Sequence, residues 1–325
     1  MINSKYFADM QAFPKQFDYT YDVTLPDTYP QKPRILLCGM WWSALYVPLV
    51  QDLLNYHQID IRLESCSGYT LPPYATENTV IICASHSGNT EETISCFHEA
   101  IKNKAHVVVF TSGWQLMQLA QEQQIPYYHI PTGLQPRLST WYFISALLDL
   151  LTQLTYPLHP IQKTLHAVST STLTETDQHE ALMIAKEFHW KTPLIYTTDV
   201  LKSMSLISKI KLNENSKTPA FAHYIPELNH NEMCGWMGKT MEPYFLMFTS
   251  KFTHPRNLRR INIMRELLTQ EGYTITIIDP KGDSLEGEAV RIYQFMDYVT
   301  YYLAELQGID PEPVQMVEDF KQMLG

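Results

Sequence analysis

Short apolar runs that alternate with helical stretches constrain the fold of this chain more than any other feature. Before residue 131, the runs predicted to be strands are 34–38 (RILLC), 60–63 (DIRL), 79–83 (TVIIC), 106–110 (HVVVF) and 127–130 (YYHI). Stretches with helical periodicity separate or follow them, at 43–56, 91–103, 115–122 and 136–154. Mostly apolar strands that alternate with helices indicate a parallel sheet covered on both faces.

A change of composition divides the chain. Residues 166–178 are rich in Ser and Thr and are typical of a loop or linker. A second β/α series follows, with strands expected at 194–197, 244–249 and 273–278. Because 325 residues are many for one compact domain, we predict an α/β protein with two subdomains, 1–155 and 156–325. Each would be a mainly parallel sheet flanked by helices, a three-layer sandwich.

Charge and composition argue against several classes of partner. The net charge is −10 and no Lys/Arg cluster offsets it, so nucleic-acid binding is not expected. The apolar stretch 141–154 is too short and too polar to span a bilayer. Residues 1–17 lack an apolar signal core, so a cytoplasmic protein without membrane contact is expected. The five cysteines show no CxxC spacing and the histidines no HExxH spacing, which predicts reduced thiols and no metal site.

The segment 85–90, SHSGNT, follows the strand predicted at 79–83 and leads into a helix. Open parallel sheets bind ligands beyond the carboxyl ends of their strands. The helix start supplies amide donors and partial positive charge, and Ser85, Ser87 and Thr90 add hydroxyls. Gly88 would let the backbone approach closely. The segment therefore predicts a site for a small phosphate ester, since it lacks the Gly-Lys of a nucleotide-binding loop.

An ordinary helix start remains an alternative for the same residues. Asn89 or Thr90 would then cap the helix, and Glu91 and Glu92 would complement its dipole.

Four segments carry a resemblance to a known family. Residues 85–93 (SHSGNTEET) look like the phosphate loop of the sugar isomerase (SIS) domain. Residues 131–139, 213–236 and 302–321 resemble signatures of the bacterial and archaeal bifunctional phosphoglucose/phosphomannose isomerase family, the second most specifically. This resemblance implies two SIS-type subdomains in a homodimer. It also implies interconversion of glucose 6-phosphate and fructose 6-phosphate, with mannose 6-phosphate as a further candidate, without metal or organic cofactor.

The resemblance also implies roles for residues of the N-terminal half. Ser85, Ser87 and Thr90 would hold the phosphate, and Gly39 and Ser43 would belong to the substrate-binding turn after the first strand. In the C-terminal half, Glu214 would carry the proton between C1 and C2. His230, reaching the site from the partner subunit, would assist ring opening, and Lys321 would act at the ring oxygen.

The resemblance also implies that Arg137 would stabilise the charge of the intermediate.

The chemistry of the reaction agrees with the roles implied for Glu214, Arg137 and His230. A cis-enediolate intermediate needs one base that loses and regains a proton, and a carboxylate with a tuned pKa suits that task. Arg137 offers a permanent charge on a rigid fork, and a histidine exchanges protons near neutral pH.

Each catalytic candidate also has an ordinary structural interpretation. Glu214 could be a solvated helix-end glutamate, and Arg137 could form a salt bridge at a helix start, where Pro136 suits the first turn. His230 could be satisfied by its polar neighbours, and Lys321 could be an exposed helix lysine.

Tryptophans replace family glycines at two turns. The family's first turn reads Gly-Met-Gly-Gly-Ser, whereas residues 39–43 read GMWWS, and Trp114 likewise stands where a second glycine is usual. The rings of Trp41 and Trp42 could pack in the core or an interface, line the pocket and change the substrate, or block it. An isomerase of another phosphosugar and a non-catalytic sugar-phosphate-binding protein therefore remain alternatives. Residues 309–316 lack the threonine linked to mannose activity in the family.

Overall fold

The computed structural model describes residues 2–168, 173–238 and 241–324. The chain forms two compact units. We refer to Phe13–Ser169 as the N-terminal unit, and to Met1–Ala12 together with Thr170–Gly325 as the C-terminal unit. This division differs from a single boundary after residue 155. Tyr6 is buried in the C-terminal unit, where its hydroxyl donates to Asn215 Oδ1 (2.9 Å). Ile161 lies beyond residue 155, yet it is buried and its helix, residues 159–168, belongs to the N-terminal unit.

The N-terminal unit contains a five-stranded parallel sheet in the order β2-β1-β3-β4-β5. Its strands are β1 (Arg34–Gly39), β2 (Leu63–Cys66), β3 (Thr79–Ser85), β4 (His106–Thr111) and β5 (Tyr127–His129). Four predicted strands are confirmed, and the one expected at 60–63 lies three residues later. Every residue of β3 is buried, which agrees with a central strand covered on both faces.

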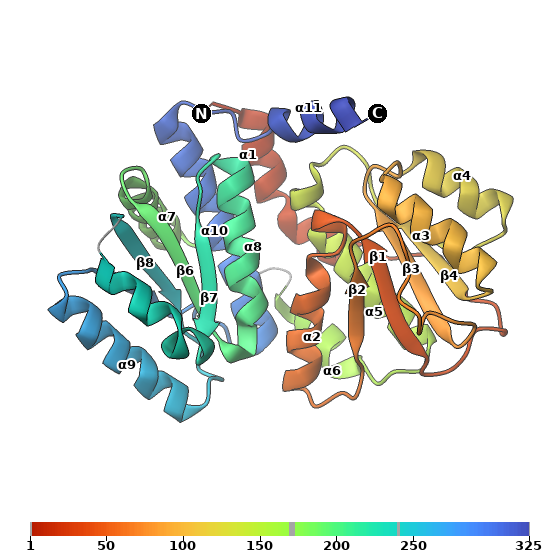
Figure 1. The fold of residues 1–325 in the computed structure, drawn as a ribbon, viewed down its shortest axis with the longest axis horizontal. Coiled ribbons are helices and arrows are strands. Elements are labelled where there is room, and N and C mark those ends of the chain that lie inside the picture. The colour runs from red at the N-terminus through yellow and green to blue at the C-terminus, as the bar shows by residue number, and fades with distance from the viewer. Residues whose placement is uncertain (1, 169–172, 239–240, 325) are drawn as a thin grey trace. The chain divides into compact units, whose positions relative to one another are not determined.

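Helices cover both faces of this sheet (Figure 1). They are α2 (Tyr46–Tyr56), α3 (Glu91–Lys102), α4 (Trp114–Glu122), α5 (Thr140–Gln153) and α6 (His159–Val168), with short 3-10 turns η1 (Phe13–Asp18), η2 (Trp41–Ser43) and η3 (Pro136–Leu138). On one face, Phe97 of α3 and Leu116 of α4 pack with Ile81 and Val109 of the sheet. Helix α3 carries Glu91 and Glu92 in its first turn and Lys102 in its last, which complements its dipole.

The C-terminal unit contains a four-stranded parallel sheet in the order β7-β6-β8-β9. Its strands are β6 (Thr192–Thr198), β7 (Phe221–Ile225), β8 (Pro243–Phe248) and β9 (Ile275–Ile278). The three strands predicted here are confirmed, and β7 is an additional edge strand. The order matches β2-β1-β3-β4 of the other sheet, although the sequence shows no exact repeat.

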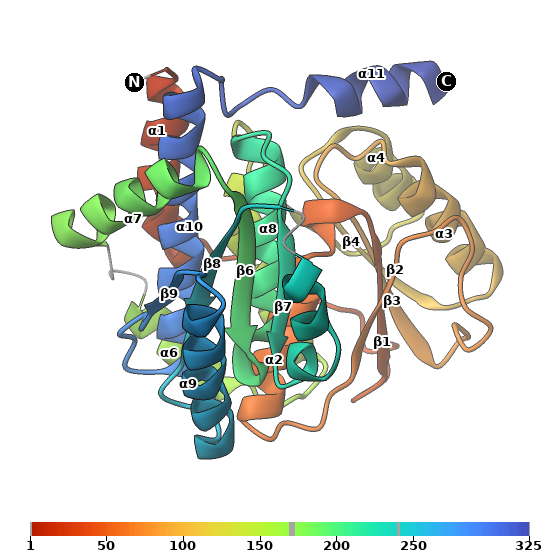
Figure 2. The same cartoon turned by 60° about the vertical axis from the view of Figure 1, so that its left-hand side comes forward.

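The helices of this unit pack around its sheet, except the last one before the C-terminus, which extends away from it (Figure 2). They are α1 (Ser4–Gln11), α7 (Glu175–Phe188), α8 (Lys202–Asn215), α9 (Pro255–Gln270), α10 (Leu285–Gln307) and α11 (Gln315–Leu324), with turns η4 (Asp199–Leu201), η5 (Glu227–His230) and η6 (Glu232–Gly238). Helix α9 packs on β6 and β8 through Ile261, Met264 and Leu268. The predicted linker 166–178 is helical at both described ends, in α6 and α7, and residues 169–172 lie outside the described part.

Within the described residues, no helix is long and apolar enough to cross a membrane.

Candidate active site

The predicted phosphate loop joins β3 to α3, and its hydroxyls converge. The Oγ of Ser85 lies 2.8 Å from Thr90 Oγ1 and 3.4 Å from Ser87 Oγ, and it accepts a hydrogen bond from the Gly88 amide (3.0 Å). Ser85 is only 1% exposed, whereas Ser87 is exposed and Thr90 is partly exposed. Ser85 therefore organises the loop from its buried side, and the hydroxyls of Ser87 and Thr90 lie nearer to solvent at the start of α3.

Simple helix capping does not account for these residues. Thr90 is the N-cap of α3, but its side chain makes no capping hydrogen bond and pairs with Ser85 instead. The Asn89 side chain accepts from the Gln115 amide (3.3 Å), which ties the loop to the start of α4. The capping alternative is therefore wrong for these side chains, although Glu91 and Glu92 do occupy the first turn.

The packing of the loop against the neighbouring turn requires a glycine at position 88, whether or not a ligand is bound. Its φ is +74°, a region that favours glycine, and an added Cβ would lie 1.8 Å from the carbonyl oxygen of Gly113. The close backbone approach expected at this glycine therefore involves the neighbouring β4–α4 turn.

The first β/α turn supports the loop from the side. Ser43 is buried, and its Oγ accepts a hydrogen bond from the backbone amide of His86 (3.0 Å). A Cβ on Gly39 would lie 2.8 Å from the carbonyl oxygen of Ala84, so the glycine lets β1 end against β3. Both predicted residues thus lie beside the loop, where they fix its backbone.

His86 is a loop residue to which the sequence analysis gave no role. Burial lowers the pKa of its imidazole to about 4, so the ring is neutral at physiological pH. Its carbonyl accepts from the Ser112 amide (3.4 Å) and its Nε2 is buried. The backbone of the loop is thus fixed from two turns, by Ser43 and Ser112.

Two of the three tryptophans at these turns adopt a backbone conformation that favours glycine. Trp41 has φ +58° and Trp114 has φ +55°, both in the left-handed region. The Trp42 side chain is only 2% exposed and belongs to the core, whereas Trp114 is 73% exposed. Trp41 is partly exposed. Core packing therefore describes Trp42, and Trp114 points to solvent.

Arg137 lies in η3, and this turn packs against η2, the turn that contains Ser43. Its side chain is 1% exposed, and Pro136 opens the short helix as predicted. Because a guanidinium stays ionised, Arg137 places a permanent positive charge in the turn that packs against η2.

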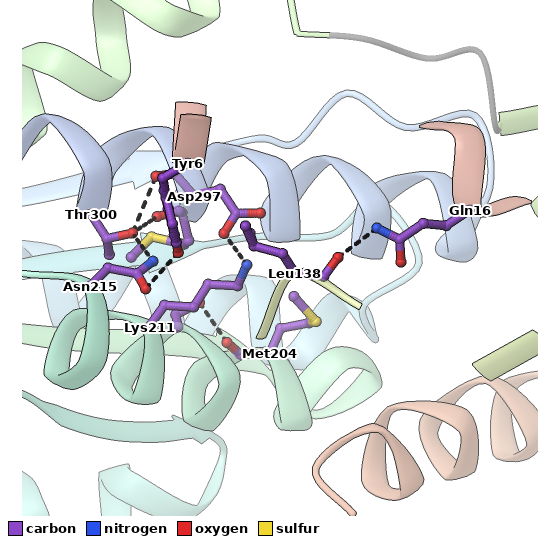
Figure 3. Close-up of polar contacts among 10 residues, drawn as sticks. Tyr6, Gln16, Leu138, Met204, Lys211, Asn215, Asp297 and Thr300 are labelled. Atoms are coloured by element: carbon purple, nitrogen blue, oxygen red, sulfur yellow. Dashed lines mark hydrogen bonds and ion pairs between the residues drawn. The ribbon is translucent and has the colours of Figure 1, made fainter. Parts of the chain in front are cut away.

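Glu214 occupies the last turn of α8 and is only 6% exposed, so its interpretation as a solvated helix-end glutamate is wrong. Its helix is fixed to α10 by what we call the α8–α10 polar cluster (Figure 3). This cluster consists of Tyr6, Lys211, Asn215, Asp297 and Thr300.

The α8–α10 polar cluster is buried and internally paired. Lys211 forms an ion pair with Asp297, and its Nζ also lies 3.2 Å from the ring centroid of Tyr293. Asn215 donates to Thr300 Oγ1 (2.8 Å). Because Lys211 and Asn215 flank Glu214 in the sequence, these contacts fix the last turn of α8, which carries Glu214. No local pattern in the sequence marks these residues, because their partners lie far away along the chain.

His230 and Lys321 are exposed. His230 ends η5, and its exposed side chain forms no hydrogen bond with any residue that the structure describes, so its interpretation as a histidine satisfied by its neighbours is wrong. Lys321 lies on α11, where its Nζ is 2.9 Å from Glu318 Oε1, one turn earlier. Glu214, His230 and Lys321 all belong to the C-terminal unit, and the phosphate loop, Ser43 and Arg137 to the N-terminal unit.

Solved structures with the same architecture define the class of fold. The C-terminal domain of glucosamine-fructose-6-phosphate aminotransferase from Francisella tularensis covers 96% of this chain and 99% of its own, at a TM-score of 0.70 and 13% identity. The tagatose-6-phosphate ketose/aldose isomerase of Escherichia coli covers 96% and 93%, at 0.61 and 16%. At these identities the likeness establishes an SIS-type α/β fold.

Sequence comparison is more specific. Residues 177–324 match the family described as bacterial phospho-glucose isomerase C-terminal SIS domain. The bifunctional phosphoglucose/phosphomannose isomerase of Aquifex aeolicus is 31% identical over 318 residues, 97% of each chain. The enzyme of the same name from Thermoplasma volcanium is 31% identical over 95% of each. The chain belongs to the bifunctional phosphoglucose/phosphomannose isomerase family and is an isomerase.

Proposed function

We propose that this protein interconverts glucose 6-phosphate and fructose 6-phosphate, with mannose 6-phosphate as a further substrate. The observation that carries the proposal is the presence of two features in a chain of this family. One is a loop of converging hydroxyls at the carboxyl edge of a parallel sheet, and the other is a buried glutamate, Glu214, at the end of a helix.

The phosphate would be held by the 85–90 loop. Ser87 and Thr90 supply hydroxyl donors, and the start of α3 adds amide groups and partial positive charge. Ser85 and Ser43 fix the backbone of the loop, so its donors need no rearrangement when the ester binds.

Glu214 would be the base. It takes the proton from C2 of the open-chain aldose and returns it to C1, while the hydroxyl proton at C2 moves to the C1 oxygen through a cis-enediolate. No net proton is gained or lost. Arg137 would stabilise the negative charge that develops on the enediolate oxygens.

His230 and Lys321 would open the sugar ring, with His230 supplied by the partner subunit of a cytoplasmic homodimer. The exposure of His230 and its lack of a partner among the described residues support this role. Lys321 is exposed on an amphipathic helix and would act at the ring oxygen.

A coupled assay of the purified protein with glucose 6-phosphate and mannose 6-phosphate tests the proposal. Glu214→Gln should lower kcat by on the order of 10³-fold, because general-base catalysis contributes about 10² to 10⁴. Glu187→Gln changes a partly exposed glutamate that pairs with Lys191; it is the matched control and should retain wild-type turnover. Absence of turnover by the wild type, or an unaffected Glu214→Gln variant, would contradict the proposal.

A different phosphosugar is the second candidate. The D-glucosamine-6-phosphate 4-epimerase of Sulfolobus acidocaldarius is 31% identical over 158 residues, about half of each chain. A panel of hexose, pentose and amino-sugar phosphates would separate the two candidates. If every sugar phosphate raised the Tm without turnover, the protein would be a binding module, as the Trp41 substitution allows.

A further inference from the structure

Three cysteines that are distant in sequence meet in the N-terminal unit. Cys38 lies on β1, Cys66 ends β2 and Cys96 lies on α3. Their Sγ atoms all lie within 4.8 Å of one another. Cys38 and Cys66 are direct neighbours in the parallel ladder, and the α3 helix brings Cys96 over them. Sequence spacing does not reveal this cluster, because a CxxC pattern identifies only ligands that come from one short loop.

The spacing of the three sulfurs fits one metal ion. With Zn–S bonds of about 2.3 Å, ligands of a tetrahedral zinc ion lie about 3.8 Å apart. The cluster would therefore contract by about 1 Å or less. Thiolate sulfur prefers soft or borderline cations and does not suit Mg²⁺ or Ca²⁺.

Oxygen atoms and an opening to solvent complete the environment. The thiol of Cys96 donates to the carbonyl oxygen of Gly68, and that of Cys66 to the carbonyl of Thr70, both at 3.3 Å. When the thiols lose their protons, these carbonyls or a water molecule can provide a fourth ligand. Cys66 is only partly buried, so a cation can enter beside it, whereas Cys38 and Cys96 are buried.

We propose that Cys38, Cys66 and Cys96 form a binding site for one thiophilic divalent cation, Zn²⁺ or its congener Cd²⁺. Binding replaces three thiol protons, which leave to solvent, and no atom changes oxidation state. Three thiolates with a dication carry a net charge of −1, whereas a monovalent ion would leave −2. Since buried net charge is costly, the divalent ion is favoured.

The site adjoins the phosphate loop through the sheet. Cys38 pairs with Cys83 of β3, two residues before Ser85, and Gly39 follows Cys38 directly. Cys96 lies on the helix that begins after Thr90. A bound cation would cross-link β1, β2 and α3 beneath the loop, and we expect it to raise the Tm of the protein.

Titration of the reduced, metal-free full-length protein with Cd²⁺ under anaerobic conditions tests the proposal. We expect one Cd²⁺ per chain, a thiolate-to-cadmium charge-transfer band in the ultraviolet and a higher Tm. Zn²⁺ should displace the bound cadmium and abolish the band. Cys66→Ser should weaken binding on the order of 100-fold or more, while circular dichroism reports that it folds. Cys234→Ser removes the exposed fifth cysteine and should bind as the wild type does.

Three results would overturn the proposal. They are absence of the charge-transfer band, unchanged cadmium affinity in a folded Cys66→Ser variant, and loss of binding in Cys234→Ser. A disulfide between two of the three cysteines under mild oxidation, with no cadmium binding by the reduced protein, would assign the cluster to redox chemistry instead. None of these readouts depends on isomerase activity, so failure here is distinguishable from failure of the proposed function.

Discussion

The two sheets share a strand order, but the segments that follow their equivalent strands meet different side chains. Strands β3 and β8 occupy equivalent positions, next to β1 and β6. β3 leads into the 85–90 loop, which carries the hydroxyls of Ser85, Ser87 and Thr90. The segment after β8, 249–254, instead contacts a carboxylate, because the Lys251 amide donates to Glu288 Oε1 of α10 (3.2 Å). Burial raises the pKa of Glu288 to about 7, and hydroxyls there are used internally, as in the bond from Thr253 to Thr198 (2.7 Å).

This difference shows that the same strand order creates a similar carboxyl edge in both sheets, whereas the side chains at that edge decide which ligand can bind. A dianionic ester would be repelled by a carboxylate at the β8 edge. In the N-terminal unit the 85–90 loop itself carries hydroxyls and a neutral histidine, and Arg137 lies in η3; the carboxylates of Glu91 and Glu92 follow only in the first turn of α3. The account therefore assigns phosphate binding to the N-terminal unit, and four substitutions can break or sharpen that comparison.

The largest effect is expected for Gly88→Ala. Its Cβ would clash with the Gly113 backbone at 1.8 Å and would sit at φ +74°, so the free energy of unfolding should fall by about 3 kcal/mol or more and activity should be lost. Chemical denaturation measures the change. Gly272→Ala is the matched control in the C-terminal unit, because φ is +85° but nothing lies within 4 Å of the added Cβ. It should cost only about 1 kcal/mol, and equal costs would refute the packing argument.

A carboxylate placed in the 85–90 loop should repel the phosphate ester, as the carboxylate at the β8 edge would. Ser87→Asp is exposed and should fold, but like-charge repulsion of several kcal/mol should raise KM about 100-fold. Steady-state kinetics with fructose 6-phosphate measures it. Lys251→Asp makes the corresponding change at the other edge and should leave KM unchanged. A similar rise in both variants would remove the distinction between the edges.

Glu288 should make stability fall as pH rises. Its folded pKa of about 7 exceeds the unfolded value near 4.5, so the folded state binds more protons between these values. The stability is complete below about pH 4.5 and is lost as pH rises through 7. Glu288→Gln should be about 2 kcal/mol more stable than the wild type at pH 8 and equal to it near pH 4. A gain that is independent of pH would contradict the assigned pKa.

His86 should give the smaller, opposite dependence. Its folded pKa of about 4 lies below the unfolded value of 6.5, so its contribution is present above 6.5 and is lost as pH falls toward 4. At pH 5 the loss should be about 1–2 kcal/mol. His86→Asn should flatten this part of the stability profile measured by urea denaturation. An unchanged acid limb would show that His86 is not buried in its neutral form.

Local patterns made part of this structure predictable. Strands β1, β3 and β4 are continuous apolar runs and were predicted at their places. β2 was displaced because LESC mixes buried and exposed positions, and β7 was missed because four of its five residues are partly or fully exposed. The hydroxyls of the loop were recognisable because small polar residues follow a buried strand.

Contacts between distant segments could not be predicted in this way. Lys211 and Asp297 are 86 positions apart in the sequence, and their ion pair joins α8 to α10. No pattern in the neighbouring sequence marks either residue as buried. The same holds for Ser43, which meets His86 only through the sheet, and for the three clustered cysteines. Such pairs depend on strand order, which a single sequence does not specify.

A crystal structure with bound fructose 6-phosphate tests the central claim most directly. The account predicts that phosphate oxygens lie within hydrogen-bond distance of the Ser87 and Thr90 hydroxyls, and that no phosphate occupies residues 249–254. A phosphate seated beside Glu288, or one held without any contact to the 85–90 loop, would contradict it.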